Sequence, residues 1–352
     1  MNVHHKKRIL VAPLNWGLGH ATRCMPIINA LLANNFEPVI ASDGYALSLL
    51  KKEYPNLQFF ELPSYNITYA KKGNSFKIKI VKDSPHLLKT IKREKKAIQE
   101  LTKSEDISGI ISDNRFGVRQ KHIPSVFITH QLRVLSGNTT WLSSKFHQKI
   151  ISKFDQCWIP DHRGKNNLSG ELGHVKDYQS SLKYLGPLSR FKKQKLPLRY
   201  NLLIILSGPE PQRTYLEEKL FIQLENYKGK VCFVKGILES EQKKFEKNNI
   251  TVYNYMTSVE LEKALNKCEM VLSRSGYTSL MDYAKLEKKA FLIPTPGQFE
   301  QEYLAKKLQS EGIAPSCNQK LFKIEMLKDI ENYSGFKSLE DDVNYQELFR
   351  LF

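Results

Sequence analysis

A histidine and two glycines follow the first apolar run of the chain, and these residue types could bind an anion and move a proton. The stretch Asn15–Arg23 reads NWGLGHATR and comes soon after the apolar run Arg8–Pro13. Gly17 and Gly19 let backbone N–H groups approach an anion with no Cβ in the way. His20 stands where a helix is expected to begin, and a helix N-terminus adds a partial positive charge. The spacing is not the dinucleotide motif G-x-G-x-x-G, so an anion loop and a simple turn with a capping histidine both fit.

A second polar turn follows the apolar run LLIILS. Ser207 and Gly208 end the run, and Arg213 stands near the start of an expected helix. Backbone N–H groups at a helix start, together with a guanidinium, suit a phosphate. Arg213 is therefore the candidate charge partner, and an ordinary β–α turn is the alternative.

A third polar turn follows the run CEMVLS. It consists of Ser273, Arg274, Ser275 and Gly276. Asp282 falls about two turns into the helix expected next, on the face that could reach the two hydroxyls of a ribose. The alternative for Asp282 is a surface carboxylate with no ligand.

Apolar runs alternate with helical patterns along the whole chain, which predicts an α/β fold. In the first half, strands are expected at Arg8–Pro13, Glu37–Ser42, Leu57–Leu62, Ile107–Ser112, Ser125–Thr129 and Gln156–Pro160, with helices at Ala21–Asn34 and Leu87–Lys103. In the second half, the runs NLLIILS, GKVCFVKG, ITVYNY, CEMVLS and KAFLIP predict five more strands. A basic, proline-containing connector separates the two series.

We therefore expect two doubly wound, Rossmann-like domains that face a cleft. The first spans residues 1–186, a linker spans 187–198, and the second spans 199–352 with a terminal helix, for which packing back on the first domain is one option. Such domains bind ligands at the carboxyl ends of their parallel strands. The three polar turns fall at such strand ends.

The charge of the chain is strongly asymmetric. The net charge is +18. Residues 1–198 hold 32 basic and 14 acidic residues, whereas the remainder is neutral. The run Lys71–Lys96 alone has ten basic residues against two acids. Such a charge imbalance favours an anionic partner, and a solvated helix face is the alternative for the lysine run.

Several classes of protein are disfavoured. The chain has no run of about 18 apolar residues, no secretory signal pattern and no zinc-type cysteine spacing among its five cysteines. This composition favours a cytoplasmic protein. No D-x-D motif suggests a metal, and the acidic Glu340–Asp342 lies in a polar tail.

The third turn also carries a family resemblance. The stretch from Ser273 to Pro296, with S-R-S-G, an acid on the helix and L-I-P-x-P at the next strand end, resembles the nucleotide-sugar signature of GT-B glycosyltransferases, specifically family 28. NWGLGHATR is similar to the N-terminal glycine loop of that family, with His20 at its histidine. ITHQLR, which contains His130, resembles an acceptor-side loop.

The resemblance implies roles for individual residues on the donor side. Asp282 would bind the donor ribose, in place of the more common glutamate. Gln301 and Glu302 would contact the donor sugar, and Glu302 replaces a usual glutamine. Tyr255 and Met256 would hold the uracil ring. The turn at Ser207 and Gly208 falls where a glycine-rich phosphate loop is expected.

The resemblance also implies a reaction. It is the inverting transfer of a sugar from a UDP-sugar to a hydroxyl or lipid-linked acceptor, with the UDP-sugar as substrate and no cofactor or metal. Helix N-termini and Arg213 would stabilise the departing diphosphate. His20, Asp113 and His130 are the candidates for the general base.

The basic first half suggests an acceptor held at an anionic membrane surface, with the protein peripheral on its inner face. The mixed run Phe76–Lys82 is a candidate interfacial patch. Two alternatives stay open. One is a UDP-sugar 2-epimerase or hydrolase on the same fold. The other is a nucleic-acid-binding protein, which lacks support because no aromatic-glycine RNA motif, helix-turn-helix or zinc pattern is present.

Overall fold

The computed structural model describes residues 6–65, 76–176, 178, 181–338 and 343–352, without the side chains of residues 76–85. It consists of two compact units. Unit 1 comprises Met1–Ala70, Ser75–Leu188 and Glu340–Phe352, and unit 2 comprises Lys71–Asn74 and Ser189–Leu339. The two units separate at Leu188, close to the expected linker. The last residues differ from the expected division, because they belong to unit 1 and not to the second domain.

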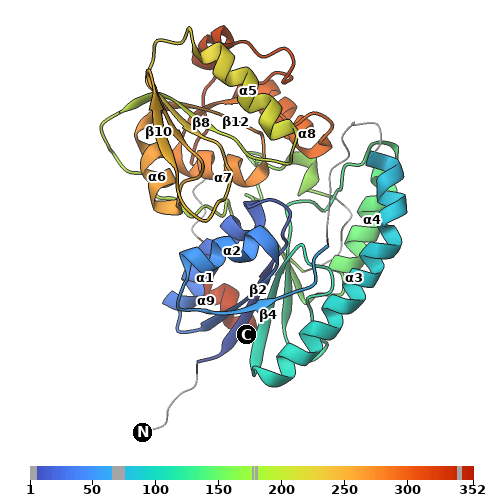
Figure 1. Ribbon diagram of the computed structural model, residues 1–352. Helices are drawn as coiled ribbons and strands as arrows, with labels where there is room; N and C mark the ends of the chain where they lie inside the picture. Colours follow the sequence, from blue (N-terminus) through green and yellow to red (C-terminus); the bar gives the residue numbers. More distant parts are fainter. Residues whose placement is uncertain (1–5, 66–75, 177, 179–180, 339–342) are drawn as a thin grey trace. The chain divides into compact units, whose positions relative to one another are not determined.

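Unit 1 is built on a parallel sheet. The described strands are β1 (Arg8–Pro13), β2 (Glu37–Ser42), β3 (Gln58–Glu61), β4 (Ile107–Asp113), β5 (Ser125–Ile128), β6 (Gln156–Ile159) and β7 (Leu182–Tyr184). The helices are α1 (Gly19–Ala33), α2 (Gly44–Glu53), α3 (Phe76–Ser104), α4 (Thr140–Ile151) and α9 (Tyr345–Leu348), with 3-10 turns at Gly137–Thr139, Gly170–Leu172 and Phe349–Leu351. The strand order is β3-β2-β1-β4-β5-β6-β7. Figure 1 shows α1 and α2 on one side of this sheet and α3 and α4 on the other.

The strands of unit 1 are apolar because helices cover both faces of a parallel sheet. Five consecutive residues of β1, Ile9–Pro13, are buried. The order of the strands reverses between β1 and β4, which is the topological switch point where doubly wound folds bind ligands. In the register of these two strands, Pro13 lies opposite Asp113. The turn that contains His20 and the end of β4 therefore meet at one edge of the sheet.

Aromatic residues anchor the end of the chain on unit 1. The ring of Phe349 lies 5.6 Å from that of Phe36, and the ring of Phe352 lies 6.2 Å from that of Trp158. A Cβ on Gly109 would lie 2.3 Å from the Phe352 ring, so a glycine is required where this ring crosses β4. Aromatic contacts thus explain why the terminal helix belongs to unit 1.

Unit 2 is a second doubly wound unit. The described strands are β8 (Tyr200–Ile205), β9 (Val231–Val234), β10 (Lys244–Lys247), β11 (Ile250–Tyr253), β12 (Cys268–Ser273) and β13 (Lys289–Leu292). The helices are α5 (Gln212–Leu224), α6 (Ser258–Asn266), α7 (Tyr277–Leu286) and α8 (Phe299–Ser310), with a 3-10 segment at Ile324–Asn332. The order β10-β11-β9-β8-β12-β13 has its switch point between β8 and β12.

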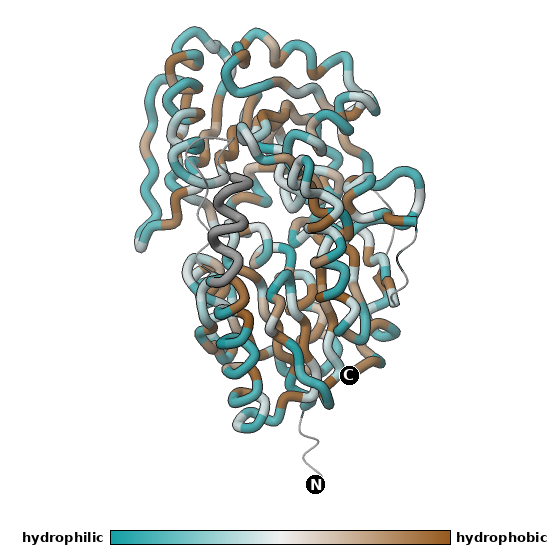
Figure 2. Tube along the Cα trace, turned by 90° about the vertical axis from the view of Figure 1, so that its right-hand side faces the viewer, coloured by the Kyte–Doolittle hydropathy of each residue, from teal (hydrophilic) through white to brown (hydrophobic). Residues whose placement is uncertain are grey.

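The second and third polar turns therefore flank the switch point of unit 2, because one follows β8 and the other follows β12. The strands around them form an apolar core with Leu216 and Leu220 of α5 and Phe322. In Figure 2, the trace is mainly hydrophobic along the central strands and hydrophilic at the surface helices. The five strands expected in this unit are confirmed. β10 was not expected, because all four of its residues are exposed and it pairs antiparallel with β11 at the sheet edge.

No described helix is long and apolar enough to cross a membrane.

Candidate active site

Three parallel strands bring the candidate catalytic residues of unit 1 together. Asp113 is the last residue of β4 and lies opposite both Pro13 of β1 and Ile128 of β5. His20 lies in the first turn of α1 after β1, and His130 follows β5 two residues beyond its end. Gly17 in the intervening turn has φ +73°, a conformation that glycine adopts at little cost. A Cβ there would meet nothing within 4 Å, so the backbone angle, and not crowding, calls for a glycine.

Asp113 is fully buried and is the centre of a charged cluster. His20 Nδ1 lies 2.9 Å from Asp113 Oδ1. Arg23 donates from Nε to Asp113 Oδ2 at 2.5 Å and from Nη2 to Asp113 Oδ1. Its Nη1 lies 3.1 Å from His130 Nδ1. Arg23 Nη2 also lies 2.8 Å from His20 Nδ1. Arg23 therefore contacts all three residues predicted from the sequence.

Sequence reasoning missed Arg23, although it stands within the quoted turn. It lies three residues after His20 on α1, and side chains at that spacing lie on the same helix face. Only 2 % of its surface is exposed. An arginine this deeply buried needs a partner, and Asp113 supplies it.

The charges of the cluster follow from burial and proximity. Burial alone would raise the pKa of Asp113, but Arg23 and His20 hold it well below its usual range. For His20, burial and Arg23 lower the pKa, and together they outweigh the opposite effect of Asp113. At neutral pH the cluster therefore contains an ionised Asp113, a charged Arg23 and a neutral His20.

A second buried arginine, Arg115, is connected to the glycine turn through Asp43. Arg115 lies 2.6 Å from both Asp43 and Glu94. Asp43 in turn accepts a hydrogen bond from Asn15 Nδ2, at the start of the glycine turn. The Tyr65 hydroxyl donates to Glu94 at 2.6 Å. This network ties the ends of β1, β2 and β4 together, and no sequence motif predicted it.

In unit 2, the turn after β8 holds Ser207 and Gly208. Gly208 has φ +100°, which disfavours any residue with a Cβ. Arg213 follows in the first turn of α5, as expected, but its charge is already balanced. Its Nε lies 2.6 Å from Glu210 Oε1 and its Nη1 lies 2.5 Å from Glu217 Oε2. The expectation that Arg213 serves as the charge partner of a diphosphate therefore loses its basis, since two carboxylates already occupy the guanidinium.

The turn after β12 holds the second buried arginine of this edge. Gly276 is the N-cap of α7, and Arg274 is 1 % exposed. Its Nη1 donates to the carbonyls of Ile293 and Pro294, both at 3.2 Å, and its Nη2 donates to the carbonyl of Gln212 at 2.8 Å. Arg274 therefore connects the turn after β12 to the end of β13 and to the start of α5.

Two of the predicted sugar-side residues shape the loop after β13. The side chain of Gln301 accepts from Thr295 N at 2.8 Å, and its backbone carbonyl accepts from Ser275 Oγ at 2.7 Å. Glu302 Oε1 accepts from Gly297 N at 2.8 Å. The structure thus brings the SRSG turn and this loop together. Ser273 Oγ donates locally, to the carbonyl of Arg274.

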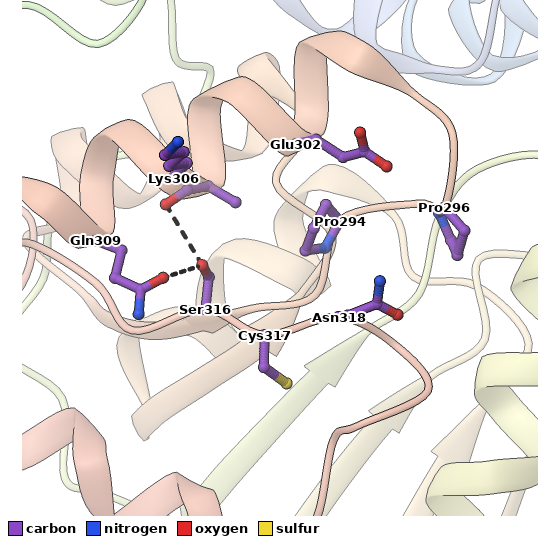
Figure 3. Close-up of a pocket in the computed structure, with 9 residues that line it drawn as sticks. Pro294, Pro296, Glu302, Lys306, Gln309, Ser316, Cys317 and Asn318 are labelled. Carbon is purple, nitrogen blue, oxygen red and sulfur yellow. Dashed lines mark hydrogen bonds between the residues drawn. The ribbon is translucent and has the colours of Figure 1, made fainter. Parts of the chain in front are cut away.

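Glu302 also lines a shallow pocket of about 230 Å³. Figure 3 shows Glu302, Lys306 and Gln309 of α8 on one side and residues 316–318 on the other, with Pro294 and Pro296 at the end near Glu302. Ser316 Oγ donates to Gln309 at 2.8 Å.

Asp282 lies on α7, 7 % exposed, and accepts a hydrogen bond from Ser189 Oγ at 2.6 Å. Burial raises its pKa to about 6, and Arg190 and Ser189 only partly offset that rise. The alternative of a surface carboxylate is therefore wrong. Tyr255 and Met256 lie in the partly exposed loop between β11 and α6, two strands away from β8. A capping box of Thr257 and Glu260 ends that loop.

Within the described residues, no group of three or more histidine, cysteine, aspartate or glutamate side chains could hold a metal ion.

The comparisons with known proteins agree with this geometry. Residues 212–331 match the glycosyltransferase family 28 C-terminal domain, and this range holds α5, the SRSG turn and Asp282. Unit 2 therefore carries a match to the family 28 C-terminal domain, and the fold of the chain is that of the GT-B glycosyltransferases. This assignment confirms the resemblance and the two-domain fold class expected from the sequence.

Two curated relatives and one solved structure show the extent of the similarity. The UDP-N-acetylglucosamine–N-acetylmuramyl-(pentapeptide) pyrophosphoryl-undecaprenol N-acetylglucosamine transferase of Buchnera aphidicola is 24 % identical over 220 residues, which are 58 % of this chain and 56 % of the relative. The enzyme of the same name from Clostridium botulinum is 23 % identical over 316 residues, covering 86 % and 82 %. The crystal structure of Acinetobacter baumannii MurG has a TM-score of 0.55 at 14 % identity, covering 94 % and 93 %.

Proposed function

We propose that this protein is a glycosyltransferase that moves a sugar from a UDP-sugar to the hydroxyl of a lipid-linked acceptor, with inversion at the anomeric carbon. The observation that carries the proposal is the His20–Asp113 pair at the switch point of unit 1. His20 is neutral, and its Nδ1 lies 2.9 Å from an ionised carboxylate. Arg23 Nη2 also lies 2.8 Å from Nδ1 and can only donate. The proposal assigns the proton of Nδ1 to the hydrogen bond with Asp113, which leaves Nε2 able to accept a proton.

The proposed reaction is a single displacement. The acceptor oxygen attacks the anomeric carbon while its proton passes to His20 Nε2. The bond between the anomeric carbon and the diphosphate breaks, and its electron pair stays on the leaving phosphate oxygen. Attack from the face opposite the leaving group inverts the anomeric centre. Asp113 stabilises the imidazolium that forms and is too buried to be the base itself.

Unit 2 supplies the residues for the donor. The relatives named above carry UDP-N-acetylglucosamine in their names, which supports a UDP-sugar donor here. Asp282 on α7 is assigned to the ribose, and Tyr255 and Met256 to the base. Glu302 stands where a sugar contact is expected, and its negative charge favours a donor sugar that offers hydroxyl or N–H donors.

The test is turnover with a panel of UDP- and TDP-sugars, with and without a polyprenyl-diphosphate-sugar acceptor, and with nucleoside diphosphate release as the readout. Sugar transfer that depends on the acceptor, and is lost in His20→Ala, supports the proposal. Formation of a new UDP-sugar or of free sugar without an acceptor would instead indicate an epimerase or a hydrolase. No turnover of any donor would refute sugar transfer.

A membrane surface as partner has support from α4 in unit 1. Trp141, Leu142 and Phe146 are 71 %, 62 % and 44 % exposed, and Lys145 and Lys149 are exposed beside them. These five residues lie on one side of the helix, opposite four buried residues. Exposed aromatic and aliphatic side chains among lysines are typical of a helix that inserts into the interface of an anionic bilayer. The patch expected at Phe76–Lys82 lies among side chains outside the described ones.

Co-sedimentation with phosphatidylglycerol vesicles tests this partner. We expect binding that weakens with salt and is lost in the double variant Trp141→Ser, Phe146→Ser. The matched control is Tyr215→Ser, Ile222→Ser, which removes two similarly exposed apolar side chains from α5 in unit 2. Equal loss of binding in both double variants would rule out a specific role for α4.

A further inference from the structure

Asn254 is a buried polar residue of unit 2 whose amide makes its full set of hydrogen bonds. It directly follows β11 and is 7 % exposed. Its Nδ2 donates to Glu239 Oε2 at 2.8 Å and to the carbonyl of Glu241 at 2.9 Å. Its Oδ1 accepts from Lys243 N at 2.8 Å and from Tyr255 N at 2.9 Å. An asparagine side chain offers two donors and two acceptor positions, and all four are used here.

Three of these four bonds go to one connecting segment, residues 235–243, which joins the end of β9 to the start of β10. Residues 240–243 of the connecting segment are exposed, so hydrogen bonds to a buried side chain decide its shape more than apolar packing does. Near its start, Gly236 has φ +71°, and a Cβ there would lie 2.1 Å from the carbonyl oxygen of Leu206. The connecting segment is therefore held at Gly236 by the end of β8 and further along by Asn254.

The same contacts fix the backbone of Tyr255, which the proposed function assigns to the nucleobase. Asn254 Oδ1 accepts from Tyr255 N, and Gln242 Nε2 donates to the carbonyl of Tyr255 at 3.0 Å. Gln242 Nε2 also donates at 2.8 Å to Glu260 Oε2, the acid of the capping box. Both backbone polar groups of Tyr255 are thus bonded to side chains. A loop fixed in this way presents its side chains in one geometry, which discrimination between similar ligands requires.

We propose that Asn254 is a positioning residue for nucleobase selectivity, and that it acts by holding Tyr255 and the connecting segment in place. The ligand class is a pyrimidine nucleoside diphosphate. A purine carries a second fused ring, and a loop that cannot move excludes the larger base. Asn254 therefore acts through the loop that carries Tyr255 and Met256. This inference rests on the proposed function, because it takes a UDP-sugar as the donor and these two residues as its base contacts.

The test compares the affinities of full-length variants for UDP and ADP by isothermal titration calorimetry. Asn254→Ala removes all four hydrogen bonds and releases the loop. We expect the ratio of UDP to ADP affinity to fall by about tenfold, mainly through weaker UDP binding. Gln242→Ala, at an exposed position, releases only the carbonyl side of Tyr255 and should lower the ratio by about threefold. In turnover, Asn254→Ala should raise the KM for the UDP-sugar more than it lowers kcat.

Asn266→Ala is the matched control, because Asn266 is an equally buried asparagine of the same unit. It is 7 % exposed and lies at the end of α6. Its Nδ2 donates to the carbonyls of Lys192 and Glu262, and its Oδ1 accepts from Gln194 N. The control should lose a similar free energy of unfolding in calorimetry but keep the wild-type ratio of UDP to ADP affinity.

The outcomes separate this inference from the proposed function. An unchanged ratio in Asn254→Ala would overturn the inference, and so would an equal fall in Asn266→Ala, because lost stability would then be the cause. A wild type that binds ADP as tightly as UDP would also overturn it, since there would be no selectivity to explain. If Asn254→Ala does not fold, Gln242→Ala decides by the same criteria. A wild type that binds no nucleoside diphosphate would refute the proposed function instead.

Discussion

Replacing Asp282 by asparagine should make unit 2 more stable and its donor site weaker. Burial raises the pKa of Asp282 from 3.8 to about 6, so ionising this carboxyl costs the folded protein more than the unfolded chain. Each pKa unit corresponds to 1.36 kcal/mol, and the cost is therefore about 3 kcal/mol once the group is fully ionised in both states. Asparagine keeps an oxygen that can accept from Ser189 but carries no charge.

The sign and the pH range follow from the raised pKa. Below about pH 4, Asp282 is protonated in both states and the cost is absent. Between about pH 4 and 6 the unfolded chain ionises first, so the wild type loses stability as the pH rises. Above pH 6 the whole cost is present. The variant should therefore exceed the wild type in free energy of unfolding by about 3 kcal/mol at pH 7.5, and the difference should shrink towards pH 4.

Calorimetry is the suitable assay, because Trp16, Trp141 and Trp158 all lie in unit 1 and fluorescence would not follow unit 2. For a unit of this size, about 3 kcal/mol corresponds to a rise in Tm of roughly 6–12 °C. Asp329→Asn, at an exposed aspartate of the same unit, is the control and should change stability by less than about 0.5 kcal/mol. A gain that does not depend on pH would refute the burial argument, and unchanged UDP affinity in Asp282→Asn would refute the ribose assignment.

Three further predictions concern the two switch points. Because burial and a neighbouring guanidinium lower the pKa of His20, kcat/KM should stay constant from pH 8 down to 6.5 and fall only below that. A fall in kcat/KM that begins above pH 6.5 would contradict the assignment of His20 as base. Gly208→Ala should lower the free energy of unfolding by about 1–2 kcal/mol, because Gly208 has φ +100°, and should weaken UDP binding. Gly276→Ala is the control: Gly276 has φ −71° and open space for a Cβ, so calorimetry should show a nearly unchanged stability. Glu302→Gln keeps an oxygen for the hydrogen bond from Gly297 N, so its stability should stay constant while its preference among donor sugars changes in a turnover panel. An unchanged preference would show that Glu302 does not recognise the sugar.

The strands were predictable because both faces of a parallel sheet are covered, which produces continuous apolar runs. β1 and β2 have the bounds expected from the sequence. β10 was not predicted because its sequence, KFEK, is exposed at a sheet edge and has no pattern of buried residues. Packing of the terminal helix on the first unit was one of the options considered from the sequence, but its contacts were not predictable, since Phe349 and Phe352 contact Phe36 and Trp158 over distances in sequence that no local pattern reports.

Strand order explains why the candidate site of unit 1 was partly predictable. Turns at the ends of strands were recognisable as places for ligand chemistry, and together with the family resemblance they pointed to His20, Asp113 and His130. Their mutual contacts depend on β1, β4 and β5 being neighbours, which the order of strands along the chain does not reveal. Arg23 was missed for the same reason, because its role is set by Asp113, which lies 90 residues away in sequence.

For the two arginines of unit 2, Arg213 and Arg274, charge pairing could nevertheless be predicted from nearby residues in the sequence. Arg213 has glutamates three residues before it and four residues after it, a spacing that pairs charges on a helix. That spacing already predicts a neutralised guanidinium. Arg274 has no acidic residue within four positions on either side, and the strand before it is buried. An arginine that follows a buried strand with no acid nearby must find its counter-charge elsewhere in the fold or in a ligand, and the fold offers Arg274 only carbonyls. The distribution of acids around each arginine, more than the mere presence of an arginine after a strand, therefore distinguishes a guanidinium paired with nearby carboxylates from one held by backbone carbonyls.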